Sequence, residues 1–336
     1  MNRNLLKYVV AIILTAGALY LAFRGQDFNS VLENLKHANV LALIGIVFFQ
    51  LVAHFVRAWR WQFLLRPVKQ KINIYNSFKA VVGGYGLNNV IPRAGELVRP
   101  AMIAQSEKIP FSSALATIVL ERILDVIALG TILVISLALF QKEFAASFPD
   151  IARNSVTAIF LIATGLAVFV LVLVNRTVEG WMFSIIKKIL PKKIGDKVIH
   201  LLETFIAGLH GLSKDTIFPI ILGTLGVWLF YTLSTYVGIF VLPGSGIENI
   251  GIDGAVTLLA LTGIAITIPT PGGTGSYHLF ISRALIGFFL ISSPLALAFV
   301  TITHAVNYIA ITVIGLFYML RAGVSVGSAQ QKSGQQ

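Results

Sequence analysis

Six charged side chains stand inside otherwise apolar sequence, and their types suit the binding of an anion. They are Arg93, Glu96, Arg99, Glu121, Arg122 and Asp125. Guanidinium groups present a planar fork of N–H donors that matches phosphate oxygens. The carboxylates would hold these arginines in place, and the i,i+3 spacing puts Arg122 and Asp125 on one helix face. The pattern predicts a phosphate site, with mutual pairing of the charges as the purely structural alternative.

A second set of residues interrupts the apolar runs with asparagine, proline and glycine. Asn88 and Asn89 precede Pro92, and the motif PTPGGTG at 269–275 ends another apolar run. The glycines that would let backbone amides approach a ligand are Gly272, Gly273 and Gly275. A helix that starts after such a break, as we expect from Pro92 onward, presents free amides and the positive end of its dipole to anions. We therefore expect both breaks to add donors to one phosphate site.

The composition places this site in a membrane. The chain has 336 residues, 56% hydrophobic and 12% charged, with a mean hydropathy of +0.84. Such values are typical of a polytopic membrane protein with several helical spans. The net charge of +12 comes from basic residues in short loops beside apolar runs, the positive-inside pattern, so we expect no nucleic-acid partner.

Several kinds of chemistry have no residues to perform them. The chain contains no cysteine, so disulfides and thiolate catalysis are excluded. It has neither a G-x-x-x-x-G-K-[ST] loop nor an H-E-x-x-H motif, so we expect no ATP motor, no metal and no cofactor. Its histidines are scattered along the sequence. His278 follows the PGG turn and His304 follows the second predicted hairpin, so both are candidate substrate-binding residues.

Two apolar halves, residues 1–150 and 151–324, position these side chains. Full spans are predicted at 8–23, 40–58, 111–140, 155–174, 216–242 and 294–320. The segments 73–108 and 254–291 are broken in the middle, and each arm is too short to cross about 30 Å of hydrocarbon, so both are predicted to be re-entrant hairpins. Amphipathic elbow helices are expected over 178–212, and the polar tail 325–336 is expected to be disordered.

The second half repeats the pattern of the first with inverted membrane topology. Pro92 and Pro271 lie 179 residues apart, and Arg122 and His304 lie 182 apart. This near-constant offset predicts an all-α fold of two inverted-topology repeats with about six spans, in which a substrate binds between the two hairpin tips near the bilayer midplane. Basic loops place both termini in the cytoplasm of a plasma-membrane protein. The residues assigned to the first cytoplasmic cluster are Arg57, Arg60, Arg66, Lys69, Lys71 and Lys79.

Three motifs together resemble a known family. The segments NNVIPRAGELVRP, ALATIVLERILD and PTPGGTGSYH are similar to the lysylphosphatidylglycerol synthase transmembrane-region family of flippase-like membrane proteins, over about residues 5–321. The resemblance implies movement of lipids or lipid-linked headgroups between leaflets. It assigns roles to Pro92, Arg93, Gly95, Glu96, Arg99, Glu121, Arg122, Asp125, Pro271, Gly272, Gly273 and Gly275. Many members have a glutamate where this chain has His278, which here is either a group that titrates near neutrality or a neutral hydrogen-bond donor.

The residues and the resemblance favour a transporter for a phospholipid or a polyprenyl-phosphate-linked lipid, acting as a monomer or a homo-oligomer. No soluble transferase domain follows the last predicted span, so we expect no enzyme activity. Two alternatives stay open: an intramembrane transferase that uses Glu121 and His304, and a non-transporting partner of a lipid-modifying enzyme.

Overall fold

The computed structural model describes residues 36–154, 176–192 and 214–322, together with isolated positions within 13–33 and 157–199. Every regular element among these residues is helical, which confirms the predicted all-α class. The longer helices are α3 (Val40–Leu65), α4 (Ile74–Val90), α5 (Gly95–Glu107), α6 (Phe111–Leu139), α9 (Arg176–Ile189), α11 (Lys214–Gly238), α12 (Ile252–Ala265), α13 (Ser276–Phe289) and α14 (Ser293–Arg321). The short ones are α7 (Gln141–Ser147), η1 (Ile239–Val241), η2 (Ile247–Asn249) and η3 (Pro271–Gly273).

Three of these helices are long and apolar enough to cross a membrane, namely α3, α11 and α14. Together α6 and α7 make a fourth candidate, bent by 98° where they join. These helices coincide with four of the six predicted spans. The predicted spans at 8–23 and 155–174, much of the elbow segment 178–212 and the tail 325–336 lie largely or wholly outside the described residues. The structure thus shows a polytopic arrangement with three or four spans in the part of the chain that it describes.

Side-chain caps fix where the first described helices begin. The Asn39 carboxamide oxygen accepts hydrogen bonds from the amides of Leu41 at 3.0 Å and Ala42 at 3.3 Å at the start of α3. Asn73 accepts a bond from the Tyr75 amide at 2.8 Å at the start of α4. Such caps satisfy amides that have no partner within the helix. The far end of α3 lies at Leu65, beyond the predicted end at residue 58, because apolar residues continue past the arginines in this helix.

The helices α4 and α5 form an antiparallel hairpin within the segment 73–108. A Cβ atom on Gly95 would collide with the Gly84 carbonyl group, so the two backbones touch where both residues are glycine. The turn contains Pro92 and Arg93, and Arg93 has a left-handed φ of 62°. Because this conformation interrupts helical geometry, α5 starts at Gly95. Pro92 therefore lies before the helix, which corrects the prediction that it opens the first turn.

Glu107 ties the open end of this hairpin to the α3–α4 connection. Its carboxylate accepts a bond from Asn76 Nδ2 at 2.7 Å and pairs with Lys69 Nζ at 2.6 Å. Burial raises the pKa of Glu107, but the bonds from Lys69 and Asn76 outweigh burial and hold that pKa below its ordinary value of 4.5. The ion pair therefore stabilises the folded hairpin at neutral pH, and this effect is lost only as the carboxyl is protonated in acid.

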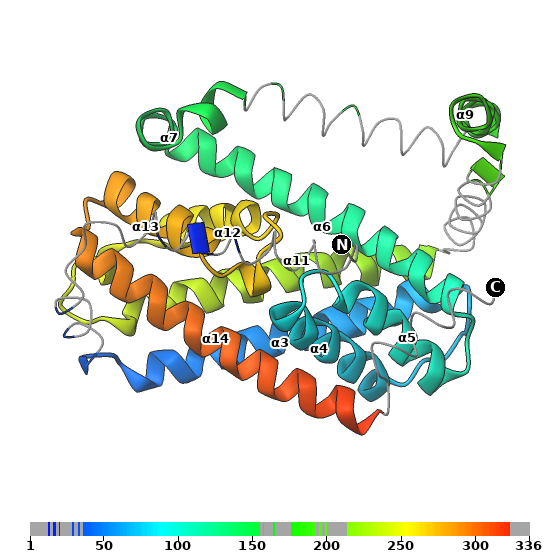
Figure 1. Ribbon diagram of the computed structural model, residues 1–336, viewed down its shortest axis with the longest axis horizontal. Coiled ribbons are helices and arrows are strands. Elements are labelled where there is room, and N and C mark those ends of the chain that lie inside the picture. The colour runs from blue at the N-terminus through cyan, green and yellow to red at the C-terminus, as the bar shows by residue number, and fades with distance from the viewer. Residues whose placement is uncertain are drawn as a thin grey trace.

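The helices α12 and α13 form a second hairpin, with η3 in the turn. The Ser276 hydroxyl donates to the Gly273 carbonyl oxygen at 3.0 Å where α13 begins. The other end of α13 is closed by Leu290, whose φ of 54° is left-handed. The two hairpins lie toward opposite ends of the long axis, with α14 running beside both (Figure 1).

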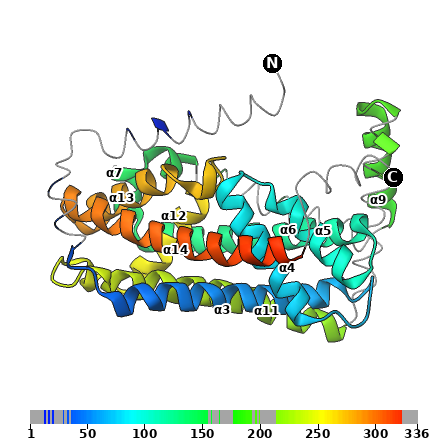
Figure 2. The same ribbon diagram turned by 60° about the horizontal axis from the view of Figure 1, so that its bottom comes forward.

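Two antiparallel helix pairs join the halves of the chain. In the first pair, α3 lies along α11 (Figure 2), and the Ser234 hydroxyl donates to the Ile46 carbonyl oxygen at 3.0 Å. In the second pair, α4 crosses α14 at Gly86 and Gly315. A Cβ atom on Gly86 would lie 2.8 Å from the Gly315 Cα atom, so this crossing has backbone against backbone.

The tips of the two hairpins meet beside α14. The Arg93 guanidinium donates to the Thr267 carbonyl oxygen across the tips at 3.3 Å. The Tyr308 hydroxyl on α14 donates to the Asn89 carbonyl oxygen at 2.8 Å. Asn89 Nδ2 in turn donates to Thr312 Oγ1 at 2.9 Å. The breaks in the two hairpins are thus anchored to one another and to a long helix.

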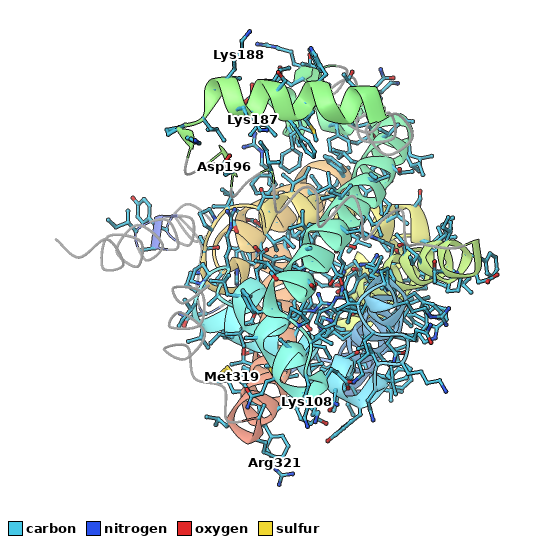
Figure 3. The ribbon with its side chains drawn as sticks, turned by 90° about the vertical axis from the view of Figure 1, so that its right-hand side faces the viewer. Lys108, Lys187, Lys188, Asp196, Met319 and Arg321 are labelled. Atoms are coloured by element: carbon cyan, nitrogen blue, oxygen red, sulfur yellow. The ribbon has the colours of Figure 1, made fainter. Side chains whose placement is uncertain are left out.

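The helix α9 stands apart from this bundle, as the end-on view in Figure 3 shows. It has lysines 187 and 188 in its last turn. Trp181 is 68% exposed and Ile189 is 74% exposed. Basic helices with exposed apolar residues are typical of the membrane surface.

Candidate functional site

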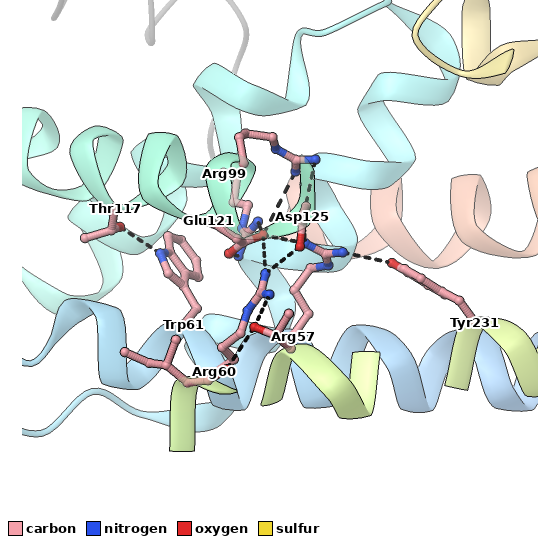
Figure 4. A network of polar contacts seen from close by, with 11 residues as sticks. Arg57, Arg60, Trp61, Arg99, Thr117, Glu121, Asp125 and Tyr231 are labelled. Atoms are coloured by element: carbon pink, nitrogen blue, oxygen red, sulfur yellow. Dashed lines mark hydrogen bonds and ion pairs between the residues drawn. The ribbon is translucent and has the colours of Figure 1, made fainter. Parts of the chain in front are cut away.

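Four arginines and two carboxylates form a buried cluster where α3, α5 and α6 meet (Figure 4). We call it the arginine–carboxylate cluster, and its members are Arg57, Arg60, Arg99, Glu121, Arg122 and Asp125. Five of these side chains are exposed by 11% or less. Charges buried this deeply are stable only when they are paired and hydrogen-bonded.

Glu121 lies at the centre of the cluster. Its carboxylate accepts two bonds from Arg99, one to each oxygen, both at 2.7 Å. Arg57 Nη1 donates to Glu121 Oε1 at 2.7 Å. The two-point contact with Arg99 is the strongest geometry that an arginine and a carboxylate form, so Glu121 holds α5 and α3 against its own helix α6.

Asp125, one helical turn further along α6, completes the pairing. Arg57 Nη1 bridges from Glu121 to Asp125 Oδ2 at 2.5 Å. Arg60 Nη2 donates to Asp125 Oδ1 at 3.0 Å. Arg60 also donates to the Thr224 hydroxyl on α11 at 3.0 Å. Asp125 therefore connects three helices through two arginines.

Aromatic rings line the same cluster. The Arg99 guanidinium lies 4.1 Å from the centre of the Trp61 ring. Trp61 is fully buried, and its indole N–H donates to Thr117 Oγ1 at 2.8 Å, which fixes the ring. The Arg57 guanidinium lies 5.6 Å from the Tyr85 ring and 5.8 Å from the Tyr231 ring. These cation–π contacts favour the charged guanidinium groups in a desolvated setting.

Arg122 differs from the other three arginines. Its guanidinium lies 3.7 Å from Asp125 and 4.0 Å from Glu121, beyond hydrogen-bond length. Its side chain is 40% exposed, whereas those of Arg57, Arg60 and Arg99 are exposed by 3% or less. The sequence places Arg122 and Asp125 on one helix face, and their charged groups do lie together, at 3.7 Å. The hydrogen bonds to the Asp125 oxygens come instead from Arg57 and Arg60.

The cluster carries more positive than negative charge. Four guanidinium groups face two ionised carboxylates, a net charge of +2 from 4 − 2. Uncompensated charge is costly in a buried setting within a membrane. An anion near Arg122 would offset this cost, and arginine forks select phosphate geometry.

The sequence predicts that Arg57 and Arg60 belong to a cytoplasmic basic cluster, and this prediction is wrong. Both are buried inside α3 and paired with α6. The signal for their position is in the sequence: the two arginines are spaced i,i+3, and the apolar run continues after them through Trp61 to Leu65. This spacing indicates one helix face and not a solvated loop.

The other charged residues of the first hairpin lie outside the cluster. Arg93 is exposed and donates to Thr267 across the tips. Glu96 makes no ion pair with any residue that the structure describes, so it does not hold the arginines as the sequence had suggested. The Gly95 amide at the start of α5 bonds to Asn88 Oδ1 at 2.7 Å. The first amide of this helix is therefore already satisfied by the protein.

Protein neighbours fill the space beside two glycines of the second tip. A Cβ atom on Gly272 would lie 2.6 Å from the Tyr308 ring, and one on Gly273 would lie 3.1 Å from Ile266. Both residues have left-handed φ values, of 55° and 75°, and Gly275 has a φ of 88°. These glycines allow the tight turn and its packing. Protein neighbours therefore occupy the Cβ side of Gly272 and Gly273, and the expected approach of their amides to a phosphate stays a prediction.

His278 and His304 come together at this second tip. Their ring centres are 5.2 Å apart. His304 Nε2 bonds to the Thr274 hydroxyl at 3.2 Å. No group of three or more possible metal ligands occurs in the described part of the chain.

A helical membrane bundle with a buried arginine site is the class that this geometry defines. Within that class, the family described as the lysylphosphatidylglycerol synthase TM region matches residues 7–315, and the chain belongs to it. The site residues of both hairpins fall inside the matched range.

Relatives with curated names are distant. A UPF0104 membrane protein of Methanocaldococcus jannaschii is 22% identical over 89% of this chain and 90% of its own length. A second UPF0104 membrane protein, from Methanothermobacter thermautotrophicus, is also 22% identical and matches 82% of each chain. The glycosyltransferase AglD of Haloferax volcanii is 22% identical over 97% of this chain, which spans 56% of AglD.

Proposed function

We propose that this protein moves a phosphate-bearing lipid between the two leaflets of the membrane, and that the arginine–carboxylate cluster receives the phosphate. The observation that carries the proposal is the net charge of +2 in a buried cluster, with Arg122 at its exposed edge. A phospholipid or a polyprenyl-phosphate-linked lipid supplies the anion that this edge lacks. The phosphate of such a lipid accepts charge-assisted bonds from Arg122.

An inverted repeat, proposed as the basis of transport, is supported by the bounds of the helices. The helices α6 and α14 begin 182 residues apart (293 − 111) and end 182 apart (321 − 139). Lys108 and Leu290 close the preceding hairpins with the same left-handed φ of 54°, and they too are 182 apart. In Figure 1, α6 and α14 run in opposite directions. Inverted repeats of this kind permit a site to open alternately to either leaflet.

The basic loops favour one orientation of the protein in the membrane, and this orientation agrees with the proposed inverted repeat. In Figure 1 the α3–α4 connection, α9 and the end of α14 lie at one end of the bundle, and the connection between α11 and α12 lies at the other. The last turn of α14 contains the basic Arg321, and the α11–α12 connection contains the acidic Glu248. Basic residues mark the cytoplasmic side.

The test is a transport assay with the full chain in vesicles. Vesicles containing a fluorescent phosphatidylglycerol are treated with an impermeant quencher, which bleaches the outer leaflet only. With the protein present, the inner pool should also bleach, at a rate above that of empty vesicles. Arg122→Gln should lower the rate about tenfold or more, because a hydrogen bond to a charged group contributes about 1.5–3 kcal/mol. Thr232→Ala is the matched control, since its hydroxyl bonds to the Trp228 carbonyl within α11. Bleaching no faster than in empty vesicles would refute the proposal.

A lipid-modifying transferase is the second candidate, because AglD is named a glycosyltransferase. This chain spans 56% of AglD, so the name covers more protein than the match does. A transferase would alter the headgroup chemically. Mass spectrometry of the vesicle lipids after the transport assay separates the two functions, since transport leaves every headgroup unchanged.

A further inference from the structure

His54 is a buried histidine to which the proposed phosphate site gives no role. It lies in α3, three residues before Arg57, so the two side chains share one face of that helix. Its side chain is fully buried, and neither ring nitrogen has a hydrogen-bond partner among the residues that the structure describes. Buried polar atoms nearly always have a partner, so two unpaired nitrogens on one buried ring indicate a functional role.

Aromatic side chains from two other helices surround His54. The Tyr85 ring on α4 lies 4.5 Å from the His54 ring, centre to centre, at an angle of 31°. The Tyr231 ring on α11 lies 6.2 Å from it at 82°. Trp228, one turn before Tyr231, has a buried indole N–H that also has no partner in the described part of the chain. Because aromatic faces attract cations, these surroundings accept a protonated imidazole better than aliphatic ones would.

The charged groups that face His54 belong to the arginine–carboxylate cluster. Arg57 comes from α3, Arg99 from α5 and Glu121 from α6, and each interacts electrostatically with the His54 ring. Two guanidinium groups thus oppose one carboxylate around this ring. Positive charge outweighs negative charge here, so the arrival of an anion in the cluster makes a proton on His54 more favourable.

Tyr85 brings His54 close to the edge of the cluster where the phosphate is proposed to bind. The Arg57 guanidinium lies 5.6 Å from the centre of the Tyr85 ring. Arg122, the arginine at the exposed edge, interacts electrostatically with Tyr85 as well. A charge bound beside Arg122 therefore acts on His54 through buried surroundings, where water and salt screen it little.

We infer that His54 takes up one proton when a phosphate-bearing lipid binds beside Arg122, and that this proton crosses the membrane with the lipid. The proton comes from water and joins the ring nitrogen that carries no hydrogen, which gives an imidazolium with two N–H groups. It returns to water when the lipid leaves. This inference rests on the proposed function, because it assumes that the phosphate binds at the arginine–carboxylate cluster.

The charges of the lipid and the proton cancel. A phosphate diester carries one negative charge and the proton one positive charge, so the site keeps its net charge of +2 when both are bound. The lipid and the proton then cross without net movement of charge. An anionic lipid that crossed alone would do work with or against the membrane potential.

Proton uptake and lipid binding must strengthen each other by the same factor, because linkage is reciprocal. The lipid should therefore bind more tightly as the pH falls, by at most about tenfold per pH unit for one proton. Phosphatidylglycerol is the suitable probe, since its phosphate diester lacks the second ionisation near neutrality that a phosphate monoester has.

Titration calorimetry of the purified full chain with short-chain phosphatidylglycerol tests the inference. Measurements at pH 5.5 in two buffers of different ionisation enthalpy give the number of protons taken up per lipid. The wild type should take up about half a proton or more, and it should bind about fivefold or more tightly at pH 5.5 than at pH 7.5. His54→Gln should take up no proton and bind equally at both pH values. His37→Gln is the matched control and should behave as the wild type, because His37 is exposed in the turn before α3.

His54→Phe repeats the test with a ring that still packs against Tyr85, and it should give the same result as His54→Gln. Lipid binding by the wild type without proton uptake would overturn the inference and leave the transport proposal intact. Uptake that persists in both His54 variants would place the proton on Glu121 or Asp125 and would also overturn the inference. A wild type that binds no phosphatidylglycerol would overturn the proposed phosphate site as well.

Discussion

Arg122 and Arg60 both lie near Glu121 and Asp125, but their surroundings differ. Arg60 is fully buried and bonds to Asp125 and Thr224. Arg122 is 40% exposed and lies beyond hydrogen-bond length from both carboxylates. We infer that Arg60 holds the helices together, and we propose that Arg122 is the arginine available to a ligand.

This difference predicts opposite outcomes for two substitutions. Arg60→Ala removes one partner of a buried pair, which typically costs about 3–5 kcal/mol. Arg122→Gln should change the free energy of unfolding by less than about 1 kcal/mol, as for exposed pairs, while abolishing most lipid transport. Thermal unfolding in detergent gives the first quantity, and the vesicle assay gives the second. A large loss of stability in Arg122→Gln would mean that this arginine, too, is structural.

The sequence identified Glu121, Arg122 and Asp125 because charges in an apolar run are rare and visible. It missed Arg57 and Arg60, which stand just before a basic loop and resemble it in composition. Which arginine reaches which carboxylate depends on how α3 packs against α6, and no pattern within one helix contains that information.

At the level of the elements, two glycines determine how closely α4 and α14 approach. A Cβ atom on Gly315 would lie 2.7 Å from the Gly86 Cα atom. This close contact sets the position of Asn89 and Tyr308, which join the hairpin tip to α14. Small residues permit such backbone contact between membrane helices.

Gly315→Ala should therefore destabilise the protein by about 1–3 kcal/mol, as overpacking does in other cores. Gly180→Ala is the control, because Gly180 lies in α9 with nothing within 4 Å of an added Cβ atom. Alanine there should be neutral or slightly stabilising, by up to about 1 kcal/mol. Equal melting temperatures for the two variants would contradict a tight crossing.

The hairpins themselves were predictable, because Asn, Pro and Gly interrupt runs too short to span a bilayer. Their exact turns were not. The left-handed conformation of Arg93 moves the start of α5 to Gly95, and local propensity gives no sign of a positive φ at an arginine.

For the whole molecule, the repeat offset and the basic loops together imply one orientation in the membrane. Lys71 and Lys188 are exposed beside the proposed cytoplasmic end, and Asn249 is exposed in the loop at the other end. Single cysteines can be placed at these positions without interference, since the chain has none of its own.

An impermeant thiol reagent applied to intact cells should label Asn249→Cys and leave Lys71→Cys and Lys188→Cys unlabelled. All three should react after the membrane is permeabilised, which controls for their accessibility. Labelling of Lys188→Cys from outside would contradict the orientation and with it the inverted repeat.

Native mass spectrometry of the purified protein tests the central claim, that the arginine–carboxylate cluster binds a lipid phosphate, most directly. The wild type should retain a phosphate-bearing lipid, identified by fragmentation, and Arg122→Gln should retain markedly less of it at the same detergent concentration. Thr232→Ala should retain as much as the wild type. If the retained lipid lacks a phosphate, or if Arg122→Gln holds it equally well, the cluster is an internal ion-pair network and not a headgroup site.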